Sequence, residues 1–233
     1  MLSREQNAML QFKLHSVPLK EAISDTKLEP LIALNNTLID AASWFGISEH
    51  YARQAERSSF IKDNARAKQC QSLLKRHNQT GLEILSRAHS HLDKLSADFG
   101  KGRPAGRDKD VKTIVTRSLE DLKAIVTDFD TKSSDAKKLG DAIDEVGAAF
   151  AEAGHDGVIK LLQKKVTELQ DLRSRPDRGA VENIPVWKAA AIIAAVGIWV
   201  IALIHCGFFG CSVSWGAAYA IGFAIAAYIA FFC

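Results

Sequence analysis

The last 45 residues of this 233-residue chain contain no Asp, Glu, Lys or Arg, and all 57 charged residues lie at or before Lys188. The overall charged fraction of 24% therefore averages a polar first part with a very apolar end. A helix needs roughly 20 apolar residues to cross a bilayer core about 30 Å thick. The uncharged end is long enough for two crossings, so it predicts a membrane-inserting hairpin over 189–233.

The apolar end is interrupted once, by an uncharged turn at 205–214. This position predicts one membrane helix from Trp187 to Ile204 and a second from Trp215 to Cys233. Tryptophan is typical of membrane–water interfaces, and the apolar turn is expected to enter lipid. The residues predicted to insert into the membrane or anchor the hairpin there are Trp187, Trp199, Phe208, Phe209 and Trp215.

Small residues recur at helical spacing in both apolar segments, which would allow two helix backbones to approach closely in lipid. The alternatives are plain lipid-facing alanines, or a buried helix pair in a soluble core, which the length without charge disfavours. A strand is also possible over 218–226, where small and large residues alternate, but a strand pair leaves backbone groups unsatisfied in lipid. The predicted packing residues are Ala190, Ala194, Ala218, Gly222, Ala226 and Ala230.

Basic residues accumulate just before the apolar end. Between Lys160 and Lys188 there are seven basic residues against four acidic ones, a pattern that suits an anionic lipid surface. Segment 181–188 is expected to be a juxtamembrane linker, and the positive-inside tendency keeps this side cytosolic. The predicted lipid-headgroup residues are Arg173, Arg175, Arg178 and Lys188.

The polar part, 1–180, reads as one helical domain with a loop at 100–109, where Gly and Pro are dense. Apolar residues spaced three and four apart predict a single helix over 110–153, ended at Gly154, and a further helix ended by Pro176. Helices are also expected over 4–15, 29–44 and 48–99, and no strand pattern competes. The fold class is all-α: an antiparallel bundle of long amphipathic helices with a C-terminal transmembrane hairpin. Its heptad stripes indicate an intramolecular core or, alternatively, a coiled-coil seam between copies.

No catalytic, cofactor-binding or metal site is expected. His89 and His91 point to different sides of a helix, and Gly100-Lys101 lacks the remaining P-loop residues. The charge is not arranged as a nucleic-acid-binding stripe. An enzyme, a nucleic-acid partner and a small-molecule substrate are therefore not predicted. Cys70 is expected to be an inert buried thiol, and Cys206 could bridge to Cys211 if the turn faces an oxidising space.

Moving the uncharged turn across a bilayer would cost little free energy. Each Asp, Lys or Arg in a turn would add roughly 2.5–3.5 kcal/mol to that cost at the bilayer centre. This favours insertion after synthesis. The layout, amphipathic helices followed by a charge-free hairpin, resembles that of α-helical pore-forming proteins such as the pore domains of colicin toxins, although no sequence motif is shared. The resemblance implies a protein made in soluble form that oligomerises in a target bilayer. The alternative is a permanently anchored cytosolic adaptor or scaffold.

Overall fold

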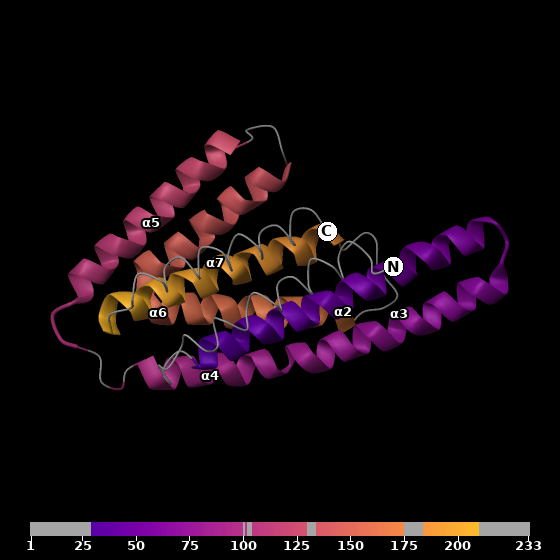
Figure 1. The fold of residues 1–233 in the computed structure, drawn as a ribbon, viewed down its shortest axis with the longest axis horizontal. Helices are drawn as coiled ribbons and strands as arrows, with labels where there is room; N and C mark the ends of the chain where they lie inside the picture. The colour runs from indigo at the N-terminus through magenta and orange to yellow at the C-terminus, as the bar shows by residue number, and fades with distance from the viewer. Residues whose placement is uncertain (1–28, 100, 102–103, 130–133, 175–183, 210–233) are drawn as a thin grey trace.

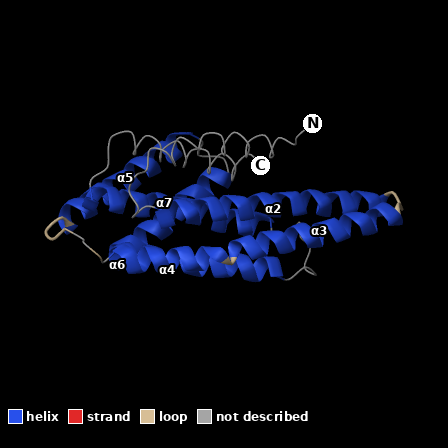
Figure 2. Ribbon diagram, turned by 60° about the horizontal axis from the view of Figure 1, so that its bottom comes forward, coloured by secondary structure: helices blue, strands red, loops and turns tan. Residues whose placement is uncertain are grey.

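The computed structural model describes residues 29–99, 101, 104–129, 134–174 and 184–209. These residues form helices and connecting turns without a strand, which confirms the all-helical fold class. The helices pack side by side in an elongated bundle (Figure 1, Figure 2). The predicted helix over 4–15 and the second half of the apolar hairpin lie outside the described residues. The helices are α2 (Glu29–Phe60), α3 (Asn64–Leu85), α4 (Arg87–Phe99), α5 (Asp108–Phe129), α6 (Ser134–Ser174) and α7 (Ile184–Phe209).

α2 pairs with α3 and, toward its start, with α4, and the chain reverses between α2 and α3 at residues 61–63. The sequence had predicted the break near Gly46, and this prediction is wrong. Phe45 is 2% exposed and lies against Gly81 of α3, where an added Cβ would approach the Phe45 ring to 2.5 Å. Burial of Phe45 fixes the helix on both sides of Gly46, and the packing outweighs the weak helix propensity of glycine.

An aromatic stack joins α2 to α3 farther along. The imidazole of His77 lies parallel to the rings of Trp44 and Tyr51, with centroid separations of 5.3 and 5.4 Å. Trp44 and Tyr51 are two helical turns apart on α2, so His77 is held between them. Burial, and secondarily the charge of Arg76, lowers the pKa of His77 from its ordinary value.

This lowered pKa predicts a pH-dependent stability. An unfolded histidine titrates near pH ~6.5, so below that pH the unfolded chain binds more protons than the folded one. The free energy of unfolding should therefore fall on acidification and level off below the folded-state pKa of His77. His77→Phe keeps a ring in the stack and removes the proton site. We expect the loss of melting temperature between about pH 7.5 and about pH 5.5 to be smaller in this variant. If the variant loses as much melting temperature as the wild type, His77 is not the source of the pH dependence.

α5 and the start of α6 form a second antiparallel pair. Lys123 Nζ lies 2.5 and 2.7 Å from the two carboxylate oxygens of Asp144. In a straight helix, residues 21 positions apart would be separated by about 30 Å, so the chain must turn back between them. The prediction of one helix over 110–153 is therefore wrong. The apolar stripe keeps its phase across 130–133, but α5 ends at Phe129 and α6 begins at Ser134.

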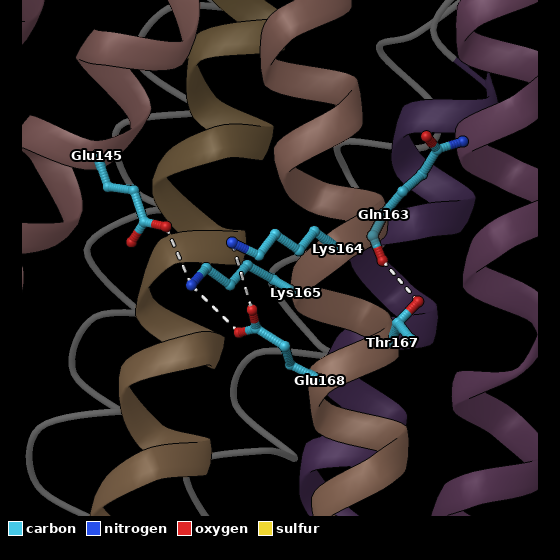
Figure 3. A network of polar contacts seen from close by, with 6 residues as sticks. All are labelled: Glu145, Gln163, Lys164, Lys165, Thr167 and Glu168. Atoms are coloured by element: carbon cyan, nitrogen blue, oxygen red, sulfur yellow. Dashed lines mark hydrogen bonds and ion pairs between the residues drawn. The ribbon is translucent and has the colours of Figure 1, made fainter.

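α6 is itself divided into two arms at Ala153 and Gly154, which have non-helical backbone angles. Gly154 has φ 59°, a left-handed conformation that favours glycine, and this confirms the break predicted there. Lys165 Nζ of the second arm lies 3.0 Å from Glu145 of the first and 3.2 Å from Glu168 (Figure 3). Burial alone would lower the pKa of Lys165, but these two carboxylates raise it overall. The network holds the arms against each other.

Candidate membrane-inserting helix

α7 is the first half of the predicted hairpin, and its described apolar side chains are buried in the bundle. Val196, Val200 and Ile201 are fully covered, and Ile204 is 1% exposed. The helix packs chiefly on α6 and also contacts α5 and α2. Its side chains belong to one continuous core with those of the amphipathic helices. A segment that is apolar enough to predict membrane insertion therefore forms part of the protein interior here.

Two glycines allow α7 to approach its neighbours closely. A Cβ added to Gly197 would lie 2.7 Å from Cδ2 of Leu162 on α6, and one added to Gly207 would lie 2.8 Å from Cγ2 of Val111 on α5. Contacts this short exclude any larger side chain unless the neighbour moves. Neither glycine is among the packing residues predicted from the sequence. The sequence feature that could have identified them is an isolated glycine within an apolar helical run, which often marks a close packing contact.

The C-terminal end of α7 meets an aromatic cluster from three helices. Phe99 of α4 stacks on His155 of α6 at a centroid separation of 3.7 Å, and His205 of α7 lies 5.3 Å from Phe99. Phe208 contacts the same Phe99 ring edge-on at 5.6 Å. His155 and His205 are 5% and 3% exposed, and His155 Nδ1 lies 3.4 Å from the exposed carboxylate of Asp156. The cluster attaches the end of α7 to α4 and α6.

α7 continues beyond the predicted start of the turn at His205 and ends at Phe209. The packing of Gly207 on Val111 and of Phe208 on Phe99 explains this extension. Arg107 Nη1 also lies 3.5 Å from the carbonyl oxygens of Gly207 and Phe208. A cation at a helix C-terminus interacts favourably with the helix dipole and with carbonyls that have no partner within the helix.

The predicted insertion and packing residues fall into three groups. Phe208 and Ala194 are buried, at 3% and 2% exposure, and Trp199 is half-buried against the core. Trp187, Ala190 and Phe209 lie on α7, but their side chains are not described. The remaining five lie outside the described residues, so their roles stay predictions: Trp215, Ala218, Gly222, Ala226 and Ala230.

Arg173 was predicted to meet lipid headgroups, but in this structure it is buried. Its Nη2 lies 2.6 Å from Oε1 of Glu49 on α2, and its guanidinium lies 4.7 Å above the centre of the Phe45 ring. Asn78 Nδ2 of α3 donates a hydrogen bond to the Arg173 carbonyl at 2.7 Å. Arg173 thus fastens the end of α6 to α2 and α3. Arg175 and Arg178 lie outside the described residues, and the Lys188 side chain is not described.

The described side chains of α7 run from Ile192 to Phe208, with a gap at Cys206. Among the described residues, no helix combines the length and apolar character that a bilayer crossing requires. The same part of the chain holds no group of three or more His, Cys, Asp or Glu side chains arranged to bind a metal ion. Cys70 is a buried free thiol.

Comparisons of the chain with protein-family models, curated proteins and solved structures give no match. The function is therefore inferred from the packing of α7 and from the uncharged sequence that follows it.

Proposed function

We propose that this is a non-enzymatic membrane-inserting protein that permeabilises a target bilayer. In one form its helical bundle conceals the apolar C-terminal region. At the membrane the bundle opens, the apolar hairpin inserts, and several copies assemble. The chain is then made as a soluble protein and becomes a membrane protein only at its target.

The burial of α7 carries this proposal. Val196, Val200 and Ile201 are fully covered, and amphipathic helices α5 and α6 lie against their helix. In a permanent anchor the crossing helix would present such side chains to lipid, and the bundle would have a separate core of its own. Within the described part of the chain, α7 instead shares one hydrophobic core with the amphipathic helices. This supports the concealed form over the anchored adaptor or scaffold, which remains the rival function.

The hairpin would anchor the inserted form without lining a channel. From Ile192 to Phe208 the polar side chains of α7 that could face water are few, and His205 is buried among aromatic rings. α5 and the first arm of α6 carry charged residues opposite their apolar stripes, as Lys123 and Asp144 illustrate. These amphipathic helices are the better candidates for an aqueous lining, because their two faces suit lipid and water respectively.

Purification without detergent separates the two functions. A concealed hairpin predicts a monodisperse protein that releases dye from liposomes, whereas an anchor predicts aggregation unless detergent is present. Protein that is monodisperse in buffer but causes no dye release would refute permeabilisation.

A single charge in the turn should reduce dye release. Ser212→Asp places a carboxylate in the segment that must cross the bilayer, at a cost of roughly 2.5–3.5 kcal/mol near its centre. Because 1.4 kcal/mol is a factor of ten, we expect release to fall by more than about tenfold. Ser96→Asp adds the same charge at an exposed position on α4 and should release dye as the wild type does. Equal release by both variants would mean that the turn does not cross the membrane.

A further inference from the structure

The turn between α2 and α3 exposes two large apolar side chains. Phe60 is 89% exposed and Ile61 is 68% exposed, the highest values among the large hydrophobic residues described. The turn lies where the α2–α3 pair projects beyond the other helices (Figure 1). Neither side chain contributes to the core, so their contact with water is unfavourable unless a partner covers them.

The turn that carries these two side chains is held by hydrogen bonds. The amide of Ile61 donates to the Arg57 carbonyl at 3.1 Å, and the amide of Asp63 donates to the Ser58 carbonyl at 2.8 Å. Asp63 Oδ1 accepts a hydrogen bond from the Arg66 amide and so caps α3. Lys62 takes the left-handed conformation, φ 63°, that closes the turn. These bonds fix the backbone of Phe60 and Ile61 at the end of the hairpin.

Exposed basic residues flank the apolar pair in the sequence. Residues 53–68 contain five basic residues against two acidic ones, a net charge of +3, and all seven are exposed. One of the two carboxylates, that of Asp63, is occupied in capping α3. Each basic residue lies within about two helical turns of Phe60 or Ile61. The basic residues are Arg53, Arg57, Lys62, Arg66 and Lys68.

We propose that this tip, residues 53–68, docks the closed protein on an anionic lipid bilayer. Phe60 and Ile61 enter the interface between headgroups and acyl chains, while the surrounding Arg and Lys side chains contact lipid phosphates. A second copy of the chain is a poorer partner, because two tips of the same charge repel each other. This docking precedes insertion, and it uses residues far in sequence from the apolar hairpin.

Vesicle flotation with the intact protein tests the docking. We expect binding to vesicles of phosphatidylcholine mixed with phosphatidylglycerol and at least about tenfold weaker binding to phosphatidylcholine alone. Phe60→Ser/Ile61→Ser and, separately, Arg57→Gln/Lys62→Gln/Arg66→Gln should each weaken binding to the anionic vesicles by a similar factor. Ile114→Ser removes another exposed apolar side chain, 45% exposed on α5, and should leave binding unchanged. Circular dichroism checks that each variant folds.

Insertion and docking are separated by holding α7 in place with an engineered disulfide between positions 111 and 207. The locked protein should still float with anionic vesicles through its tip, although it releases no dye. Undiminished binding of the Phe60→Ser/Ile61→Ser variant, or equal binding to neutral and anionic vesicles, would overturn the docking proposal. A dimer in solution that is lost in the Phe60→Ser/Ile61→Ser variant would also overturn the proposal, because the tip would then contact a second copy of the chain. If the wild-type protein binds anionic vesicles through its tip but releases no dye, that result would count against the permeabilising function alone.

Discussion

Oxidation of a Val111→Cys/Gly207→Cys variant is expected to abolish dye release, and reduction is expected to restore it. A Cβ placed on Gly207 would lie 3.5 Å from the Cβ of Val111, within the range of about 3.5–4.5 Å that disulfides require. The bond would join α5 to the end of α7 and prevent α7 from leaving the bundle. The four native cysteines are first replaced by alanine so that they cannot compete: Cys70, Cys206, Cys211 and Cys233.

The control for this variant is Val111→Ser/Gly207→Ser, which makes similar changes in size without a covalent bond. It should release dye equally under oxidising and reducing conditions. Complete cross-linking of the cysteine variant is checked by its mobility on a non-reducing gel. If the fully cross-linked protein still releases dye, α7 does not need to separate from α5, and the proposed opening of the bundle is wrong.

Arg173→Met is expected to cause the largest loss of stability of any single substitution considered. Arg173 and Glu49 form an ion pair whose side chains are only 8% and 6% exposed. Removing the cation takes the Arg173 guanidinium away from the buried Glu49 carboxylate, and breaking a buried ion pair in this way typically costs about 3–5 kcal/mol. Urea unfolding measures this loss as a shift of the transition to lower denaturant concentration.

Two further variants isolate the ion pair. Glu49→Leu/Arg173→Met removes both charges together and should recover most of the loss, because no buried charge remains. Lys123→Met breaks an exposed pair, with side chains 49% and 60% exposed, and should change stability by no more than about 1 kcal/mol. If Arg173→Met unfolds at the same urea concentration as Lys123→Met, then Arg173 does not fasten α6 to α2.

The sequence predicted the helical class well because apolar stripes at helical spacing are a local signal. Helix ends were harder to predict. The reversal at 61–63 contains neither Gly nor Pro and depends on Lys62 in a left-handed conformation, whereas Gly46 lies within a continuous helix. The reversal after Phe129 was missed because the stripe resumes in phase after 130–133. Only tertiary contacts, such as that between Lys123 and Asp144, distinguish the two possibilities.

The sequence predicted which segment forms the candidate membrane-inserting helix, but it did not predict which residues that helix contacts. The absence of charge identified the apolar region that contains α7. Its partners Val111 and Leu162 lie far away in the sequence, and nothing local to α7 indicates them. Arg173 shows the same limit, because its nearest charged neighbours in sequence suggested a lipid surface. Its ion-pair partner within the bundle, Glu49, is 124 residues away.

The two-armed shape of α6 has a consequence for how the bundle could open. The second arm packs on α7 through Leu162, while the first arm packs on α5 through Gly147 and Leu119. The joint at Gly154 has a positive φ, and no atom lies within 4 Å of the position where a Cβ would stand. If the ion pair between Lys165 and Glu145 breaks, the two arms could rotate relative to each other about this joint. α6 could then straighten into one rod of about 60 Å, twice the thickness of a bilayer core, without any helix having to unwind.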